Sequence, residues 1–349
     1  MVKKFSKKVA VAMSGGIDSS LAAALLKEKG YEVIGITMHH HNNSESLETA
    51  YQVAKKLEIP WYMIEITNEF KELIINYFCR EYLSGRTPNP CVLCNQKIKF
   101  GLLLERAKSL GADYIATGHY AINDHDKKSA RFLLKMGTDE NKDQSYFLYR
   151  LNQNVLPFIL FPLGEFKKSQ TREVAKNFGL KNDKKEESQE VCFIQEGDYR
   201  KFLKMNISLN IKPGNFVDKS GNILGVHQGI PFYTIGQRKG LGVSSNKRKY
   251  VIKINLTKNT ILLGEEEDLY NNRLIARNLN FIANSEFLNS LKVEVKIRYN
   301  SKKSPAVISS YGKNKMIINF ETPQRAITTG QSAVFYQGDV VLGGGIIEE

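Results

Sequence analysis

The chain has 349 residues, more than one typical domain, and its 42% of hydrophobic residues is enough for the cores of two or three globular domains. Its 50 Lys and Arg residues outnumber 36 Asp and Glu residues, and the formal charge of +14 predicts a polyanionic partner; genome composition or solubility is the alternative explanation. No signal peptide is recognisable and no apolar run reaches the roughly 18–20 residues of a membrane span, so we expect a soluble, cytoplasmic protein without a membrane partner.

The first third of the chain predicts alternating strands and helices. Strands are expected at residues 9–13, 32–38, 61–66 and 113–117, and helices at residues 19–29, 47–57, 69–83 and 96–110. Repeated β-α units predict an α/β domain with a parallel, doubly wound, Rossmann-like sheet. Ligands bind beyond the carboxyl ends of such strands, so we expect one nucleotide pocket where residues 14–20, 38–41 and 118–120 meet.

The turn between the first strand and the first helix has the composition of a phosphate-binding loop. Its sequence, Ser-Gly-Gly-Ile-Asp-Ser-Ser at residues 14–20, lets the backbone approach an anion, and the following helix adds the positive end of its dipole. The loop lacks the lysine of the G-x-x-x-x-G-K-[ST] motif and does not have the G-x-G-x-x-G spacing. Asp18 is expected to cap the helix, to help hold Mg²⁺, or to do both. An ordinary strand-to-helix turn is the alternative interpretation.

The chain changes character after residue 134. Helices are expected at residues 142–151 and 167–178, and near residue 204 frequent glycine and proline residues introduce a small β-rich module. Short strands follow at residues 291–299, 306–310, 316–320 and 332–336, with a last run at 339–345. Their spacing predicts an antiparallel barrel or sandwich. We therefore predict domains at residues 1–204, 205–272 and 273–349.

The chain has four cysteines, too few for a secreted disulfide framework, so catalytic, metal-bound or buried thiols are expected. Cys91 and Cys94 lie in a proline-stiffened loop before a basic helix start, which predicts a lowered thiol pKa. Cys192 lies in a strand-like run, and the sequence does not show whether it approaches the other two. Half of a zinc site is an alternative for Cys91 and Cys94, and Cys79 is expected to be a buried hydrophobe.

A run of three histidines and one separate histidine lie at the expected ligand edge of the sheet. Residues 39–41 are consecutive histidines, and because neighbours on a strand face opposite ways, they are expected to line a loop rather than bind a metal. His119, beside Gly118, is the histidine that we expect to be functional.

Six motifs occur in order along nearly the whole chain. They are S-G-G-x-D-S-S at residues 14–20, T-P-N-P-x-x-x-C-N at 87–95, T-G-H-Y at 117–120, D-Q-S-Y-F-L at 143–148, V-C-F-I at 191–194 and G-Q-R-x-G-L-G at 236–242. The first resembles the PP-loop of ATP pyrophosphatases, and the set is similar to the tRNA-specific 2-thiouridylase family (MnmA type). The resemblance implies a PP-loop domain, a small central domain and a C-terminal β-barrel that helps to grip tRNA.

The resemblance also implies a sulfurtransferase reaction. ATP, with Mg²⁺, would adenylate the C2 oxygen of the wobble uridine of a tRNA and release pyrophosphate, and sulfur would then displace AMP. Cys192 would carry the sulfur as a persulfide, received from a sulfur-relay protein or cysteine desulfurase, and Cys94 would be the nucleophile that forms a disulfide with Cys192. The residues implied to bind ATP are Ala12, Met13, Ser14, Gly15, Gly16, Ile17, Asp18, Ser19, Met38 and Gly118.

The residues implied to bind tRNA come from all parts of the chain. They are Asn89, Pro90, Cys91, His119, Lys142, Asp143, Gln144, Arg298, Tyr299 and Gln331. The first three would meet the target base, because a flipped-out wobble uridine suits recognition in a pocket.

One position departs from the family pattern, since many members carry Asp where this chain has Cys91. Three thiolates, from Cys91, Cys94 and Cys192, could hold a [4Fe–4S] cluster that delivers sulfide, as an alternative to the persulfide. Two further alternatives remain at this point. One is another PP-loop adenylating enzyme, acting on tRNA as in lysidine synthesis or ligating a small molecule. The other is a nucleic-acid-binding protein whose loop is an inactive nucleotide sensor.

Overall fold

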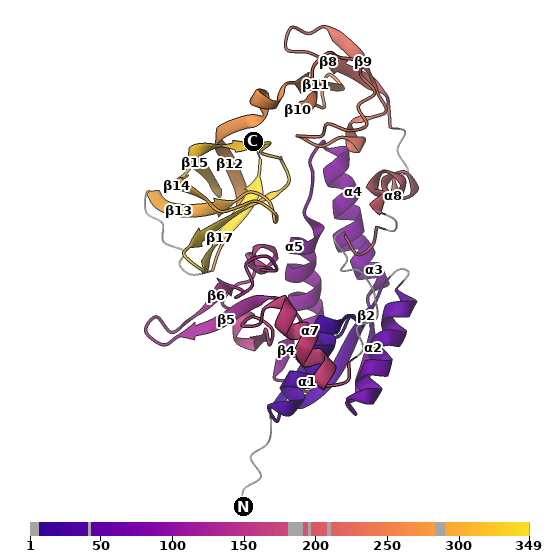
Figure 1. The fold of residues 1–349 in the computed structure, drawn as a ribbon, viewed down its shortest axis with the longest axis vertical. Helices are drawn as coiled ribbons and strands as arrows, with labels where there is room; N and C mark the ends of the chain where they lie inside the picture. The colour runs from indigo at the N-terminus through magenta and orange to yellow at the C-terminus, as the bar shows by residue number, and fades with distance from the viewer. Residues whose placement is uncertain are drawn as a thin grey trace, which may run out of the picture.

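The computed structural model describes residues 7–40, 43–180, 191–194, 197–207, 211–282 and 290–348. Figure 1 shows three parts: an α/β domain that carries the N-terminus, a small β-rich part at the opposite end, and a barrel beside them that ends the chain. The part of the chain that is described contains no helix with the length and apolarity needed to cross a membrane.

The α/β domain is built on a parallel sheet with the strand order β3-β2-β1-β4-β7. These strands are β1 (Lys8–Ala12), β2 (Glu32–His39), β3 (Trp61–Glu65), β4 (Tyr114–Ala116) and β7 (Ile159–Leu160). The first four confirm the predicted strands. Val9 and Val11 pack in one buried cluster and Ala10 in another, because successive side chains of β1 point to opposite faces. Both faces of the sheet are therefore covered, as in a doubly wound fold.

Helices from different parts of the chain cover the two faces. The cluster around Val9 includes residues of α1 (Ile17–Glu28), α2 (Ser44–Lys56) and α7 (Lys168–Asn177), and the cluster around Ala10 includes residues of α6 (Leu103–Ser109). These helices confirm the four predictions at 19–29, 47–57, 96–110 and 167–178. The predicted helix at 69–83 is present as α3 (Thr67–Phe70), a π-helical segment η1 (Lys71–Ile75) and α4 (Asn76–Leu83).

The cysteine segment is helical, so the predicted loop is wrong there. Helix α5 (Pro90–Cys94) continues through a π-helical segment, η2 (Asn95–Leu102), into α6. Pro90 occupies the first turn, where its missing N–H costs no helical hydrogen bond. The proline-rich run thus starts the helix rather than prolonging a loop.

The predicted helix at 142–151 is also wrong, since the structure has only a 3-10 turn, η3 (Ser145–Leu148). A second such turn, η4 (Leu156–Phe158), leads into β7. A hairpin of β5 (Ala121–Asp126) and β6 (Arg131–Met136) was not predicted, because polar residues fill much of β5. Its strand β6 pairs with the last strand of the barrel.

The predicted β-rich module is confirmed. After α8 (Tyr199–Asn206) it forms a sheet of the order β10-β11-β8-β9. The strands are β8 (Gly214–Val217), β9 (Ile223–His227), β10 (Tyr250–Asn255) and β11 (Thr260–Gly264), with 3-10 turns η6 (Ile230–Phe232) and η7 (Glu266–Leu269). Helix α4 reaches from the α/β domain to this part, where it contacts η6.

The barrel is antiparallel and closed, which confirms the predicted architecture. Its order is β12-β15-β14-β13-β16-β17, and β12 also pairs with β17. The strands are β12 (Tyr270–Phe281), β13 (Ser290–Lys296), β14 (Ser304–Ser310), β15 (Lys315–Arg325), β16 (Ser332–Gln337) and β17 (Val340–Ile347). Strand β12 was not predicted. The domain boundaries at 204 and 272 stay predictions.

Candidate active site

The glycine–serine loop, residues 14–20, folds tightly between β1 and α1. Gly15 has a φ of +75°, and a Cβ there would lie 2.9 Å from the Ser46 carbonyl oxygen, so the loop needs glycine at this position. The Ser19 hydroxyl accepts the Ser14 N–H at 3.1 Å and donates to the Gly16 carbonyl at 2.9 Å. The N-cap residue, Gly16, has no side chain to cap the first turn of α1. The backbone N–H groups of this first turn are therefore not capped by the N-cap residue, and the start of α1 is suited to binding an anion.

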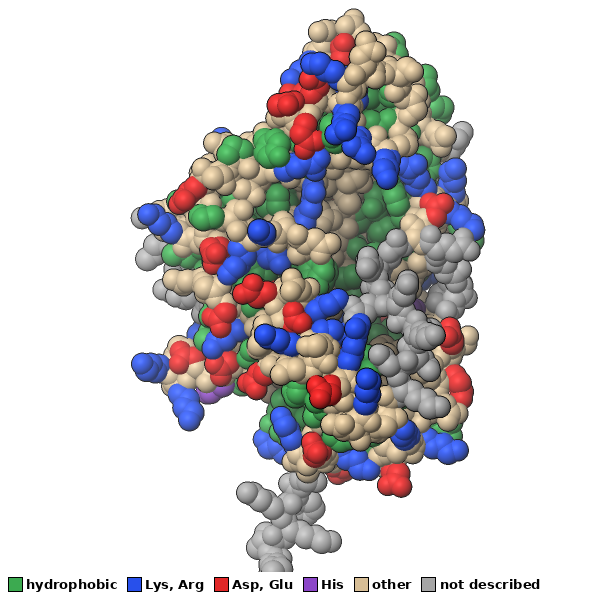
Figure 2. Space-filling model, in the orientation of Figure 1, with side chains coloured by type: hydrophobic (Ala, Val, Ile, Leu, Met, Phe, Trp, Pro, Cys, Tyr) green, Lys and Arg blue, Asp and Glu red, His purple; other side chains and the backbone are tan. Residues whose placement is uncertain are grey.

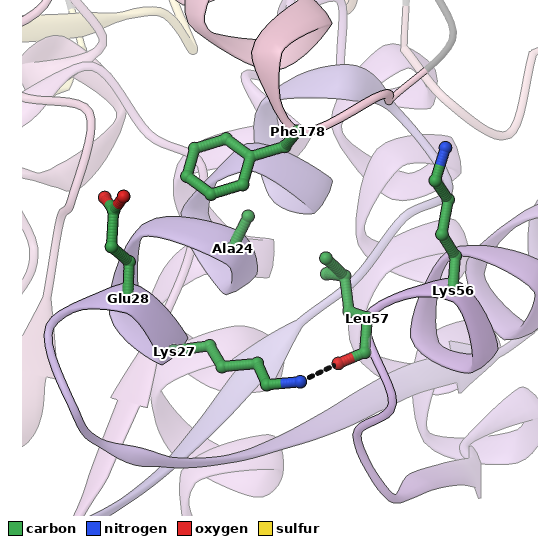
Figure 3. Close-up of a pocket in the computed structure, with 6 residues that line it drawn as sticks. All are labelled: Ala24, Lys27, Glu28, Lys56, Leu57 and Phe178. Atoms are coloured by element: carbon green, nitrogen blue, oxygen red, sulfur yellow. Dashed lines mark hydrogen bonds between the residues drawn. The ribbon is translucent and has the colours of Figure 1, made fainter.

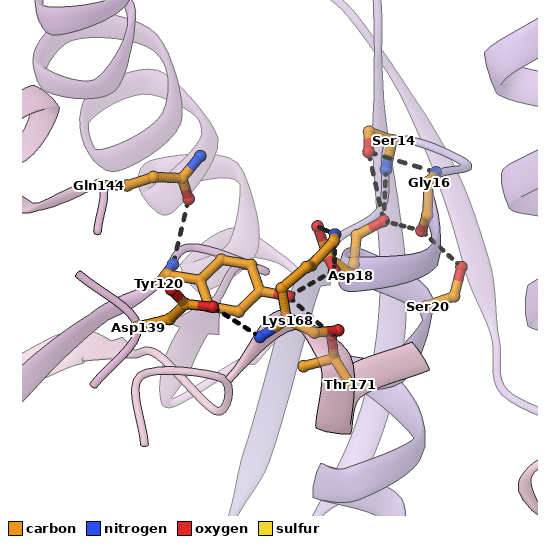
Figure 4. A network of polar contacts seen from close by, with 10 residues as sticks. Ser14, Gly16, Asp18, Ser20, Tyr120, Asp139, Gln144, Lys168 and Thr171 are labelled. Carbon is orange, nitrogen blue, oxygen red and sulfur yellow. Dashed lines mark hydrogen bonds and ion pairs between the residues drawn. The ribbon is translucent and has the colours of Figure 1, made fainter. Parts of the chain in front are cut away.

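Asp18 does not act as an end cap, because it lies inside the first turn of α1 and its carboxylate faces other elements. Its oxygens accept hydrogen bonds from Lys168 Nζ at 2.7 and 2.6 Å, and Oδ1 also accepts the Tyr120 hydroxyl at 2.8 Å (Figure 4). Sequence reasoning missed Lys168, which lies 150 residues beyond Asp18. No local signal joins the two, and only the packing of α7 against α1 brings them together.

The three predicted segments converge at the carboxyl edge of the sheet. Met13 follows β1, Met38 lies near the end of β2, and Gly118 follows β4; β2 and β4 are the two neighbours of β1. A Cβ on Gly118 would lie 2.8 Å from the backbone of Asp18 and Ser19, so the loop after β4 is packed directly on the first turn of α1. The predicted meeting point thus exists, and its role in ATP binding stays a prediction.

His119 is buried rather than open to a ligand. Its Nδ1 lies 2.6 Å from the Thr117 hydroxyl, and its ring packs against Phe100 and Phe161, with ring centroids 5.9 Å away in each case. Burial lowers the pKa of His119 well below its usual value, and the nearby Lys99 ammonium lowers it further. The imidazole is therefore neutral at physiological pH, and a contact of this ring with tRNA requires its exposure.

Cys91 and Cys94 lie one helical turn apart on α5, and their thiols are protonated at neutral pH. Burial raises the pKa of Cys91 to about 11 and that of Cys94 to about 12, and the Lys99 ammonium opposes both shifts. The predicted lowering of these pKa values is therefore wrong. Desolvation outweighs the lysine and the helix terminus at these two half-buried residues.

Cys192 lies near the two helical cysteines. A charge on Cys192 would raise the pKa of both Cys91 and Cys94, and Lys99 acts on all three thiols. The residue is exposed and belongs to a turn, so the predicted strand is wrong. The next residue, Phe193, packs edge-on against Phe70 and Phe78, at 5.8 and 5.4 Å, and so fixes the segment on α3 and α4.

The sulfur and nucleotide ends of the site share a neighbourhood. Met38 packs against the hydrophobic cluster that Cys94 and Phe193 also contact, and Lys99 influences both the thiols and His119. Among the described residues, no three Cys, His, Asp or Glu side chains lie close enough to bind one metal ion. Each thiolate of a [4Fe–4S] cluster binds a different iron, so the lack of a single-ion site does not test a cluster, and the [4Fe–4S] alternative stays a prediction.

The remaining cysteine and histidine predictions have simple outcomes. Cys79 is a buried hydrophobe, as predicted. His40 stacks on Phe70 with the ring centroids 4.4 Å apart, and His41 lies outside the described residues.

The predicted tRNA contacts between residues 142 and 144 pack against the α/β domain. The Asp143 carboxylate is buried and accepts hydrogen bonds from the Gly137 N–H and from the backbone and hydroxyl of Ser145. Burial raises the pKa of Asp143 despite these bonds. Gln144 accepts the Tyr120 N–H at 3.1 Å, and Lys142 is partly exposed. Asp143 thus holds the segment together, and direct contact of its carboxylate with tRNA requires it to leave these bonds.

The predicted contacts in the barrel hold the entry to the cysteine helix. Gln331 Nε2 donates to the carbonyls of Thr87 and Pro88 at 2.9 and 3.3 Å, and the Thr87 N–H donates to the Thr329 carbonyl at 2.9 Å. Arg298 bonds the Thr328 hydroxyl at 2.8 Å and the Ala326 carbonyl. The barrel loop at residues 326–331 is therefore fixed on one side by Arg298 and on the other by the residues that precede α5.

The other predicted contacts lie near this junction. The Tyr299 ring packs against Phe147 with the centroids 4.5 Å apart. Asn89 interacts with the buried Tyr146 hydroxyl, and Pro90 is buried at the start of α5. The structure thus gathers residues 89–91, 298–299 and 331 at one junction between the α/β domain and the barrel.

The surface of the molecule has two further features, a basic hollow and a pocket. Figure 2 shows Lys and Arg side chains around a hollow between the barrel and the β-rich part. A separate pocket lies at the far end of α1, away from the glycine–serine loop (Figure 3). It is lined by Ala24, Lys27, Glu28, Lys56, Leu57 and Phe178. This pocket contains no cysteine and no residue of the loop, so we do not assign it to the site.

The similarity to known proteins extends over nearly the whole chain. Residues 7–196 match a family model described as tRNA methyl transferase HUP domain, residues 200–265 match a tRNA methyl transferase PRC-barrel domain, and residues 271–347 match an aminomethyltransferase beta-barrel domain. The chain is 49% identical to tRNA-specific 2-thiouridylase MnmA 2 of Thermoanaerobacter sp. (strain X514), with 99% of both chains covered. It is 47% identical to tRNA-specific 2-thiouridylase MnmA of Clostridioides difficile (strain 630), again with 99% of both covered.

Proposed function

The chain belongs to the family of tRNA-specific 2-thiouridylases, and we propose that it is a tRNA sulfurtransferase that replaces the C2 oxygen of the wobble uridine by sulfur. One observation supports this proposal. Met38, at the carboxyl edge of the sheet, packs on the hydrophobic cluster that Cys94 also contacts, and Lys99 lies close enough to lower the pKa of both Cys94 and His119, the residue after Gly118. Activation of an oxygen and delivery of a sulfur can therefore take place on one bound base.

The first step of the proposed reaction is adenylation of the base. The loop at residues 12–19, with Met38 and Gly118, binds ATP, and the C2 oxygen attacks the α-phosphate and expels pyrophosphate. Asp18 fits a place beside Mg²⁺, because carboxylate oxygens are preferred magnesium ligands and its side chain is 30% exposed at the loop. Bound Mg²⁺ would neutralise charge on the phosphates. The product of this step carries AMP as a good leaving group at C2.

The second step is sulfur transfer. The outer sulfur of a persulfide on Cys192 attacks C2 and AMP leaves, so that the base is joined to Cys192 through a disulfide. The Cys94 thiolate then attacks the Cys192 sulfur, releases 2-thiouridine and leaves a Cys94–Cys192 disulfide, which an external thiol reductant must reduce. Exposure of Cys192 favours its loading by a persulfide-carrying protein. We derive no step through an iron–sulfur cluster.

The charge of the chain supports tRNA as the substrate. The formal charge of +14 and the Lys and Arg side chains around the hollow in Figure 2 suit a phosphate backbone. We propose that the junction of residues 89–91, 298–299 and 331, together with His119 and residues 142–144, lies against the tRNA. Methyl transfer, which two of the matched domain descriptions mention, explains neither the anion-binding loop nor the paired thiols.

The experiment that tests this function is reconstitution. The purified protein is incubated with unmodified tRNA, Mg²⁺, ATP, a persulfide donor and a reductant, and the tRNA nucleosides are identified by mass spectrometry. We expect 2-thiouridine, with one AMP and one pyrophosphate for each sulfur. A different modified nucleoside formed with AMP release would favour another adenylating enzyme, and the absence of AMP would favour a nucleotide sensor.

A further inference from the structure

The glycine–serine loop lacks a cation of its own. Residues 14–20 contain no Lys or Arg, although the release of pyrophosphate builds up negative charge that cations must offset. The structure brings Lys168 to this loop from the first turn of α7 (Figure 4). The question is whether this ammonium group only pairs with Asp18 or serves the reaction.

Lys168 is buried, whereas its partner is partly open. The Lys168 side chain is 10% exposed and that of Asp18 is 30% exposed, and Nζ lies 2.7 and 2.6 Å from the two carboxylate oxygens. The ammonium also lies 5.5 Å from the centre of the Tyr120 ring. A buried ion pair seldom adds stability beyond the cost of desolvating its charges, so the contact with Asp18 does not by itself show that Lys168 has a structural role.

A ring of hydrogen bonds fixes the position of Lys168. Its N–H donates to Asp139 Oδ2 at 2.9 Å, and its carbonyl accepts the Thr171 hydroxyl at 2.8 Å. Thr171 also lies 2.9 Å from the Tyr120 hydroxyl, which in turn donates to Asp18. The backbone of Lys168 is thus held in place before any nucleotide binds, and only its flexible stem has to move.

We propose that Lys168 is the cation that binds the β- and γ-phosphates of ATP and stabilises pyrophosphate as it leaves. This inference rests on the proposed use of ATP. In the nucleotide-free protein Asp18 holds the ammonium group. When ATP binds, the ammonium moves from Asp18 to the phosphate oxygens, which leaves the carboxylate free to face Mg²⁺. The exchange keeps both charges compensated in each state.

The test compares nucleotide binding by two variants with the same change in charge. Lys168→Met removes the proposed cation, and Lys167→Met removes its exposed neighbour. Isothermal titration calorimetry is carried out with Mg²⁺ and ATP, with pyrophosphate and with AMP. For Lys168→Met we expect about 10- to 100-fold weaker binding of ATP and pyrophosphate, because charge-assisted hydrogen bonds to the phosphates are lost. The affinity for AMP should stay within about twofold of the wild type. Lys167→Met should bind all three like the wild type.

A second variant separates charge from structure. Lys168→Gln keeps a hydrogen-bond donor for Asp18 but has no charge, so it should lose ATP affinity like Lys168→Met while it unfolds at a temperature near that of the wild type. Unchanged ATP affinity in either variant, or an equal loss for AMP and ATP, would overturn the assignment. Because no tRNA is needed, failure of the wild-type protein to form 2-thiouridine would overturn the proposed function alone.

Discussion

The nucleotide end and the sulfur end of the site are prepared to different degrees. At the nucleotide end, Ser14 is hydrogen-bonded to Ser19, and Asp18 to Lys168, before a ligand binds. At the sulfur end, Cys91 and Cys94 are half-buried and their thiols are protonated, and the third cysteine, Cys192, lies near them on a separate segment. The comparison teaches that the glycine–serine loop is ordered by hydrogen bonds without a ligand, whereas the two helical thiols are protonated. Under the proposed function these thiols have to lose their protons after the substrate and the sulfur donor bind.

The largest effect that we expect is a loss of thiolation without a loss of ATP binding, which would separate the sulfur end from the nucleotide end. Cys94→Ser and Cys192→Ser should each lower thiolation more than about a thousandfold, because an alcohol cannot carry or resolve a persulfide. ATP affinity should stay within about twofold of the wild type, since no thiol contributes to the loop. The readouts are 2-thiouridine by mass spectrometry and nucleotide binding by calorimetry.

The matched control for these variants is Cys79→Ala. It removes a buried thiol that lies outside the reaction and should leave thiolation close to the wild-type rate. Full thiolation by Cys94→Ser would refute the division of roles between the two ends.

The second effect concerns the resting state of the thiols. With pKa values of about 11 for Cys91 and about 12 for Cys94, their thiolate forms are rare at pH 8 and increase as the pH rises. Alkylation of these residues by iodoacetamide should therefore become about tenfold faster for each pH unit between pH 8 and pH 10, about a hundredfold in all. Mass spectrometry of peptides gives the rate at each site. A rate that levels off below pH 8.5 would mean that the thiols are already activated.

A smaller effect tests the nucleotide end by sterics alone. Gly118→Ala places a Cβ within 2.8 Å of the Asp18 and Ser19 backbone, so the loop after β4 must move away from α1. Such overpacking costs about 1–3 kcal/mol. If the displaced loop has to return to its place for ATP to bind, this cost predicts roughly a 10-fold loss of ATP affinity. In the control, Gly225→Ala, the new Cβ meets only ordinary contacts at 3.8 Å or more and should not change binding. Equal affinities for the two variants would show that Gly118 does not shape the nucleotide site.

The smallest effect tests the junction that joins the barrel to the sulfur end. Gln331→Ala removes the hydrogen bonds to the Thr87 and Pro88 carbonyls. Their loss should weaken the attachment of the barrel to the segment before α5 by about 1 kcal/mol, so the thiolation rate should fall about fivefold. ATP affinity should not change. Gln337→Ala, an exposed position at the far end of β16, the strand that follows Gln331, is the control. If Gln331→Ala changed ATP binding as much as thiolation, the junction would serve both ends.

Local patterns were enough to predict the elements that build the nucleotide end. The strand 9–13, the glycine–serine turn and the following helix are adjacent in the chain, and the rule for parallel sheets places Met38 and Gly118 beside them. Lys168 could not be predicted because its approach to Asp18 depends on how α7 packs on α1. The available sequence signal is a lysine on the helix that follows the last strand of the sheet. Many helices carry such a lysine, so this signal does not single out Lys168.

Burial explains most of the wrong predictions at the sulfur end. The lysines and the helix start near Cys91 and Cys94 are visible in the sequence, but the desolvation that outweighs them is not. The proline-rich run predicts a loop, although Pro90 is also compatible with a first helical turn. Strand β12 was missed because four exposed residues, 270–273, precede its alternating buried side chains.

The most direct test of the account follows one oxygen atom. A tRNA with ¹⁸O at C2 of the wobble uridine is converted in the reconstituted reaction, and the released AMP is analysed by mass spectrometry. If the base is adenylated before sulfur attacks, the AMP carries the ¹⁸O label, one atom for each 2-thiouridine formed. Unlabelled AMP accompanying the same amount of 2-thiouridine would contradict the account, because sulfur would then enter without activation of the C2 oxygen by ATP.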